Sequence, residues 1–64
     1  MKDTLEPGML MRMTVNPNDI WRVVRVTEKS AWMARCDEKG EFGPYDPHVW
    51  QFRRPTVARD FHPA

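Results

Sequence analysis

The sequence predicts an all-β fold of four to five short strands, and three observations carry this prediction. Turn signals built from Gly, Pro, Asn and Asp recur along the chain and leave segments of about 6 to 10 residues, which is strand length. Those segments either alternate apolar and polar residues or are rich in β-branched and aromatic ones. The 64 residues allow one domain with a thin core.

The first strand is expected over residues 9–15. Its methionines and Val15 occupy alternate positions, so we expect that side to face the core and the side with Arg12 and Thr14 to face solvent. The segment Asn16-Pro17-Asn18-Asp19 follows and predicts a loop, because proline excludes the residue before it from the helical region.

The second strand is expected over residues 20–27. Adjacent Val23 and Val24 break the alternation, as a β-bulge does. We expect an inward face formed by Ile20, Val24 and Val26. The same phase leaves Trp21, Val23 and Arg25 on the outer face.

The third strand, residues 30–36, is joined to the second by Glu28-Lys29, which predicts a tight hairpin. Its alternation places Trp32, Ala34 and Cys36 on the core side. A further turn at residues 37–40, with Gly40 at positive φ, predicts a second hairpin into Glu41-Phe42-Gly43.

The last third allows two interpretations. Asp46-Pro47 is a good helix start, and a helix could run from His48 to a stop at Pro55. Alternatively, a 3₁₀ turn at residues 47–49 precedes a closing strand over Trp50–Arg53. We favour the second, because a curled sheet needs its edge covered. The expected boundaries are an N-terminal arm (residues 1–6), a β-barrel (7–55) and a C-terminal tail (56–64).

This pattern resembles the SH3-like barrels, the group that includes KOW and Tudor-type modules. The matching residues are Pro7-Gly8-Met9-Leu10, as an opening Gly-x-hydrophobic strand, and the Val-rich segment over residues 20–26. The resemblance implies a small barrel of four to five strands with a 3₁₀ turn before the closing strand. In length and style the chain also resembles the small accessory proteins of phages and mobile elements.

The net charge of +1 is distributed in blocks. Residues 1–20 carry −1, residues 21–36 carry +3, residues 37–47 carry −3 and residues 48–64 carry +2. A dedicated nucleic-acid binder usually has a larger basic surplus, so the balance weakens that reading without removing it. The acidic block is read first as a solvated hairpin tip and second as a loop that docks on a basic surface.

No motif predicts catalysis, a metal or a cofactor. The potential metal ligands lack the short spacing of a preorganised site, and Cys36 lies on the predicted inward face. Those ligands are Cys36, Asp46, His48, Asp60 and His62. A single cysteine, no secretion signal in the first residues and no apolar run of roughly 20 residues predict a cytoplasmic protein that does not span a membrane.

The most informative pattern combines tryptophan with arginine. Each of the three tryptophans has an arginine within four positions, and arginines outnumber lysines seven to three. Arg and Trp are enriched where a surface is buried against a partner. The first candidate pair is Trp21 with Arg25, and the second is Trp50 with Arg53 and Arg54. The full set of predicted contact residues is Trp21, Arg22, Arg25, Arg35, Trp50, Arg53 and Arg54.

These residues predict a non-catalytic module that docks on a larger protein, with regulation of nucleic-acid machinery as one role. The alternative is a small nucleic-acid-binding barrel in which the same residues stack bases and contact phosphates. The third hypothesis is an oligomeric enzyme or small-molecule binder, with a site formed across the axis of a homo-oligomer. The proposed recognition face rests on one premise, that so thin a core leaves at least one tryptophan exposed.

Overall fold

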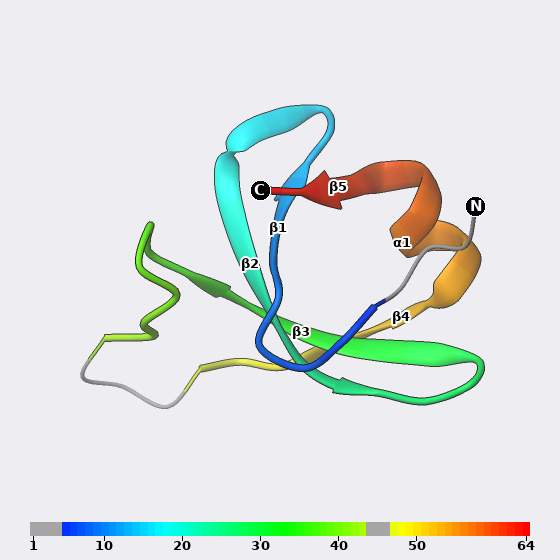
Figure 1. Ribbon diagram of the computed structural model, residues 1–64. Helices are drawn as coiled ribbons and strands as arrows, with labels where there is room; N and C mark the ends of the chain where they lie inside the picture. The colour runs from blue at the N-terminus through cyan, green and yellow to red at the C-terminus, as the bar shows by residue number, and fades with distance from the viewer. Residues whose placement is uncertain (1–4, 44–46) are drawn as a thin grey trace.

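The computed structural model describes residues 5–43 and 47–64, and these form one antiparallel sheet and one short helix (Figure 1). The elements in chain order are β1 (Leu10–Met13), β2 (Asn16–Val26), β3 (Ser30–Cys36), β4 (Trp50–Arg53), α1 (Arg54–Asp60) and β5 (Phe61–Pro63). The mostly β architecture predicted from the turn spacing is therefore confirmed.

The order of strands in the sheet is β4-β3-β2-β1-β5. The first four strands follow the chain as an antiparallel meander, and α1 then carries the chain back so that β5 pairs with β1. The sheet is strongly coiled, with α1 between its two ends (Figure 1). Within the described residues β4 and β5 are the two edges of the sheet, so it is open where a closed barrel was expected.

The β1–β2 turn lies earlier in the chain than the sequence predicts. The chain reverses at Thr14-Val15, and Met13 already pairs with Asn16. Val15, expected in the core, is 87% exposed at this turn. The extended path through Pro17 is supported by Arg12, whose Nη1 donates a hydrogen bond to the Pro17 carbonyl at 2.8 Å.

The predicted bulge in β2 is present, but the predicted phase is wrong on its N-terminal side, at Trp21 and Val23, and at Val24 itself. Pairing with β3 runs to Val23↔Met33 and resumes at Arg25↔Trp32, so Val24 is the extra residue. A bulge switches the alternation of a strand. Trp21 and Val23, before the bulge, face the core at 6% and 1% exposure, and Val24 is 42% exposed. Beyond the bulge, Arg25 is exposed and Val26 packs against the core, as predicted. The prediction of an outward Trp21 is wrong.

The phase of β3 differs from the predicted one at Trp32, although Ala34 is fully buried as predicted. Ala31 and Met33 are fully buried in the core, whereas Trp32 is half-buried on the opposite face. The register explains this, because directly paired residues share a face and Trp32 pairs with Arg25. We call the side of the sheet that carries these two residues the outer face.

Three aromatic rings from separate strands form the centre of the core. The Trp21 ring lies 5.6 Å from Phe52 and 5.7 Å from Phe61, both edge-to-face, and the two phenylalanines lie 5.3 Å apart. Such pairs contribute about 0.5–1.5 kcal/mol each beyond burial. Because Phe52 belongs to β4 and Phe61 to β5, Trp21 holds the two edges of the sheet against one another.

The segment expected as a tail, residues 56–64, completes the core instead. Val57 of α1 and Phe61 of β5 are 3% and 4% exposed. Pro55, interpreted as a stop, lies in the first turn of α1, where its missing N–H costs nothing. β4 confirms the predicted strand at residues 50–53, but residues 47–49 form no 3₁₀ turn. The helical turn comes after β4.

Two other predictions depend partly on residues outside the described ranges. Asp46, the proposed helix cap, lies outside them, as do residues 1–4 of the predicted arm. Leu5, the next residue of that arm, packs against the core.

Candidate functional site

The outer face carries a cluster of arginine and aromatic side chains. The Arg25 guanidinium lies over the Trp32 ring at 4.8 Å from its centroid, and the Arg22 guanidinium lies over the Phe42 ring at 5.4 Å. Val24 lies between the two arginines in the chain and is 42% exposed. We call these five residues the Arg–aromatic patch.

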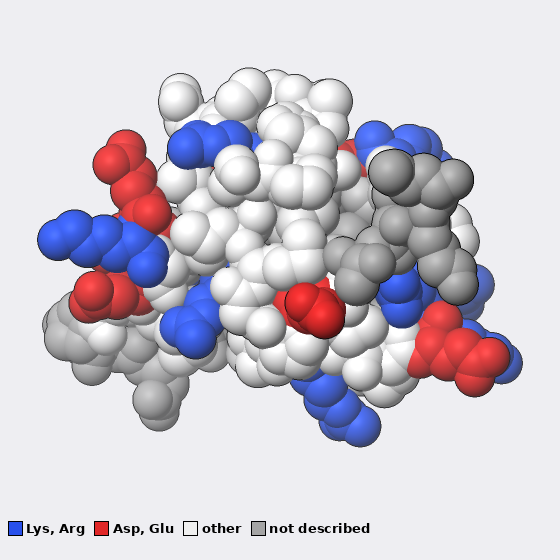
Figure 2. Space-filling view, viewed as in Figure 1, with Lys and Arg blue, Asp and Glu red and all other residues white. Residues whose placement is uncertain are grey.

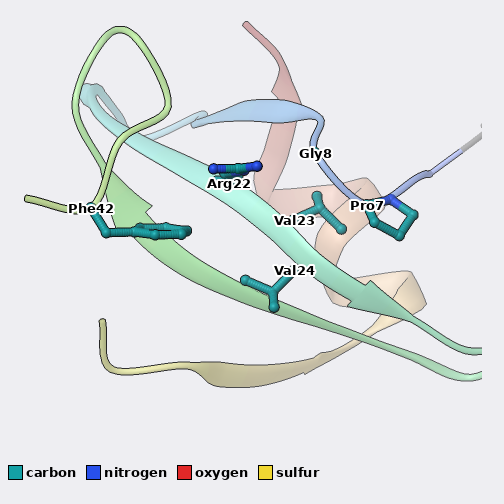
Figure 3. Close-up of a pocket in the computed structure, with 6 residues that line it drawn as sticks. All are labelled: Pro7, Gly8, Arg22, Val23, Val24 and Phe42. Atoms are coloured by element: carbon teal, nitrogen blue, oxygen red, sulfur yellow. The ribbon is translucent and has the colours of Figure 1, made fainter. Parts of the chain in front are cut away.

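The bulge in β2 builds this patch. In a regular strand Val24 and Arg25 would point to opposite sides, but the bulge lets both face outward opposite Trp32. Figure 3 shows Val23 and Val24 on opposite sides of β2, one towards the core and one towards Phe42. The outer face thereby gains an exposed apolar side chain beside an arginine.

Phe42 reaches the patch from the turn that follows β3. The Asp37 carboxylate accepts hydrogen bonds from the backbone N–H groups of Lys39 at 2.8 Å and Glu41 at 2.9 Å. These bonds, that of Glu41 foremost, lower the pKa of Asp37. Its ionised form therefore stabilises the turn, and protonation at acidic pH weakens it. The acidic residue at this position organises the backbone.

Gly40 fixes the turn against the sheet. Its φ of +83° confirms the predicted positive φ, and a Cβ at this position would lie 3.1 Å from the Leu10 Cδ2. The Gly40 carbonyl accepts a hydrogen bond from Arg22 Nη1 at 3.1 Å. Residues 41–43 form no strand, so the second hairpin predicted from the sequence is wrong, although its turn is present.

A shallow pocket of about 310 Å³ opens next to the patch (Figure 3). Its lining is mostly apolar and combines the segment before β1 with β2 and the turn after β3. The lining residues are Pro7, Gly8, Arg22, Val23, Val24 and Phe42. Hydrogen bonds from Gly8 N to the Val23 carbonyl at 2.7 Å and from Val23 N to the Met9 carbonyl at 2.9 Å hold its wall to the sheet.

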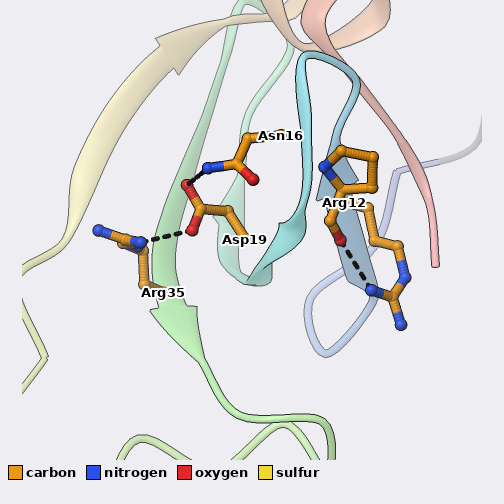
Figure 4. Close-up of polar contacts among 5 residues, drawn as sticks. Arg12, Asn16, Asp19 and Arg35 are labelled. Atoms are coloured by element: carbon orange, nitrogen blue, oxygen red, sulfur yellow. Dashed lines mark hydrogen bonds and ion pairs between the residues drawn. The ribbon is translucent and has the colours of Figure 1, made fainter.

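The structure divides the predicted contact residues among several places. Trp21 is buried in the core on the side opposite Arg25, so this proposed pair is wrong. Arg22 and Arg25 lie together on the outer face. Arg35 lies apart from them and forms an ion pair with Asp19, which also accepts a hydrogen bond from Asn16 (Figure 4).

The second proposed group does not form a joint site. Trp50 is 51% exposed on edge strand β4, and its ring packs edge-to-face on His48 at 4.6 Å. Arg53 is exposed on the same strand. Arg54 has a structural role instead, since its Nη1 donates to the Thr27 carbonyl at 3.0 Å and its backbone N–H donates to the Lys29 carbonyl at 3.0 Å.

The charges of the described residues do not form a field of one sign. Figure 2 shows basic and acidic side chains interspersed around the rim of one face, with uncharged atoms over much of its centre. Two ion pairs occur among the described residues, Arg35 with Asp19 and Arg59 with Asp60. The described residues visible in that view form no broad basic surface.

Among residues 5–43 and 47–64, no cluster of three or more His, Cys, Asp or Glu side chains is arranged to hold a metal ion. Burial, followed by the neighbouring Asp37 carboxylate, raises the pKa of the Cys36 thiol, which favours the protonated, less nucleophilic form. No helix in these ranges has the length and apolar character needed to cross a membrane.

Sequence reasoning missed Val24, Trp32 and Phe42 as members of the patch. The Val23-Val24 pair signals a bulge and so makes an outward Val24 beside Arg25 one of two possible phases. Trp32 carried no such signal, since its place depends on the β2–β3 register. Phe42 carried no such signal, since its position depends on the turn at Gly40. Comparison of the chain with protein-family models, with curated proteins and with solved structures finds no match.

Proposed function

We propose that this protein is a non-catalytic binding module that docks on a larger partner protein through the Arg–aromatic patch. The observation that carries the proposal is the pairing of exposed Val24 with two arginines stacked on aromatic rings, next to an open apolar pocket. Aromatic and arginine side chains dominate the energetics of protein interfaces. Regulation of nucleic-acid machinery by such docking stays part of this proposal.

The stacking of the arginines favours a protein partner over a nucleic acid. A base needs a free aromatic face, and the guanidinium groups of Arg25 and Arg22 already lie over the rings of Trp32 and Phe42. Stacking also restricts each guanidinium, so less conformational entropy is lost when it binds a partner group. Exposed apolar Val24 gains more from an apolar protein surface than from a phosphate backbone.

The proposal for the fold is that the coiled sheet is an open variant of the SH3-like barrels. Its support is the strand meander, the short helix before the last strand, and the return of that strand to β1. The helical turn lies between β4 and β5, one element later than the sequence indicated.

The test introduces a charge at the centre of the patch. Val24→Glu places a carboxylate between two arginines, and Val15→Glu, at an 87% exposed turn position, is the matched control. Tagged wild-type protein and both variants are used to capture partners from the native host. Each captured partner is then purified and its affinity for the three proteins is measured by calorimetry.

We expect binding by the wild type and by Val15→Glu, with a loss of at least about tenfold for Val24→Glu. Equal affinity of all three proteins would contradict the proposed docking face. Binding of a single-stranded oligonucleotide with an affinity that falls steeply with salt concentration would instead support the nucleic-acid alternative.

A further inference from the structure

We infer that the partner segment is acidic and apolar: it inserts one large apolar side chain into the pocket beside Val24 and places a carboxylate on Arg25. This inference rests on the proposed function and specifies the chemistry of the partner. It follows from the charges and the shape of the patch.

The first argument is charge complementarity. Arg35 and Arg59 have carboxylate partners within 4.0 Å, whereas the other five arginines, all among residues 5–43 and 47–64, have none there. Of these five, Arg22 and Arg25 belong to the patch. Arg22 donates one hydrogen bond to a carbonyl, and Arg25 is exposed. A guanidinium has five N–H donors, so both retain donors for a carboxylate.

The second argument is the shape of the pocket. Its volume of about 310 Å³ lies at the low end of the range for small-molecule sites, about 300–1,000 Å³, and it is widely open to solvent. Such a depression suits a single side chain of a docked segment better than an enclosed cofactor. Pro7, Val24 and Phe42 provide an apolar wall on different sides of it (Figure 3).

The charges around the pocket orient the segment. Glu6 precedes Pro7 and Glu41 precedes Phe42, so a partner carboxylate on either of these two sides of the pocket would lie near a like charge. Arg25 follows Val24 in β2, and its guanidinium lies over the Trp32 ring. The carboxylate of the partner is therefore expected next to Arg25, with the apolar side chain between Phe42 and Pro7.

The experiment selects ligands without assuming a partner. Random dodecapeptides displayed on phage are selected against the wild-type protein, and the selected peptides are synthesised. Their affinities are measured by calorimetry for the wild type, Arg25→Gln and Val24→Glu. Arg59→Gln removes the same charge from α1, where the side chain is 73% exposed, and serves as the matched control.

We expect the selected peptides to share an Asp or Glu near a large apolar residue. Replacing that acid by its amide, or Arg25 by Gln, should each weaken binding about tenfold. The two changes together should weaken binding by less than the product of the two single fold-changes, because both remove the same interaction. Arg59→Gln should bind within about twofold of the wild type.

Other outcomes separate the two proposals. Peptides that lack carboxylates but lose affinity with Val24→Glu would overturn this inference and leave the docking face in place. Peptides unaffected by Val24→Glu, or a selection that yields no binder, would count against both the inference and the proposed docking face.

Discussion

Replacement of Trp21 by alanine should unfold most of the protein. The side chain is 6% exposed and packs edge-to-face on Phe52 and Phe61. Truncating a buried Trp costs about 3–5 kcal/mol, and the core of a domain this small rarely supplies more than about 3–5 kcal/mol in total. The free energy of unfolding should therefore fall to near zero.

Two further variants make this prediction specific. Trp50→Ala removes an indole that is 51% exposed, so its cost should stay below about 1 kcal/mol. Trp21→Phe keeps a ring in the core and removes the indole Nε1–H, which is buried without an acceptor among the described residues. Because an unsatisfied buried donor costs about 1–3 kcal/mol, part of the packing loss should be offset and the variant should stay folded.

Far-ultraviolet circular dichroism and urea unfolding measure all three variants. The expected order of stability is wild type and Trp50→Ala first, then Trp21→Phe, then Trp21→Ala. If Trp21→Ala unfolds cooperatively with a free energy within about 1 kcal/mol of the wild type, Trp21 does not belong to the core and the phase assigned to β2 is wrong.

Three other predictions concern the packing around this core. Removing residues 56–64 should abolish cooperative urea unfolding, because it deletes β5 and most of α1; an unchanged transition would restore the tail interpretation. Arg54→Ala should lower the free energy of unfolding by about 1 kcal/mol through its lost hydrogen bond, whereas exposed Arg53→Ala should change it by less than about 0.5 kcal/mol. Gly40→Ala should be more destabilising than Gly8→Ala in the same assay, because both have positive φ but only Gly40 has a side chain 3.1 Å from the added Cβ.

The strands of the meander were predictable because their signals are local. Turn residues and alternation located β1, β2, β3 and β4 to within a few residues, and Gly40 identified a positive φ. The Val23-Val24 pair even indicated the bulge. The pair did not indicate which of the two valines faces the core. Residues alternate between the two faces on either side of a bulge, so an inward Val23 and an inward Val24 both fit the sequence.

The C-terminal segment was not predictable for a different reason. β5 has three residues, of which one is proline, and a strand this short has almost no pattern of its own. Its stability comes from pairing with β1 and from burial of Phe61. Pro55 was ambiguous too, since proline both ends helices and occupies their first turn.

The sequence predicted the types of residue in the candidate site, arginine with aromatic side chains, better than it predicted which residues form it. Arg22 and Arg25 were expected on a recognition surface, and both lie on the outer face. The aromatic partners of these arginines differ from those expected. The prediction paired each arginine with a tryptophan nearby in the sequence, whereas in the sheet the contacts form between neighbouring strands. Trp32 meets Arg25 through the β2–β3 register, a relation between residues seven positions apart.

The three indoles have distinct surroundings, so each can serve as an intrinsic fluorescence probe of a different event. Trp21 is enclosed, Trp32 lies under a guanidinium and Trp50 is half in water. In variants that keep a single tryptophan and carry phenylalanine at the other two positions, emission from Trp21 would follow unfolding, and emission from Trp32 would respond when a ligand displaces Arg25. Emission from Trp50 would provide the reference for an indole in contact with water. Ligand binding at the patch and unfolding of the protein could then be measured separately without an attached dye.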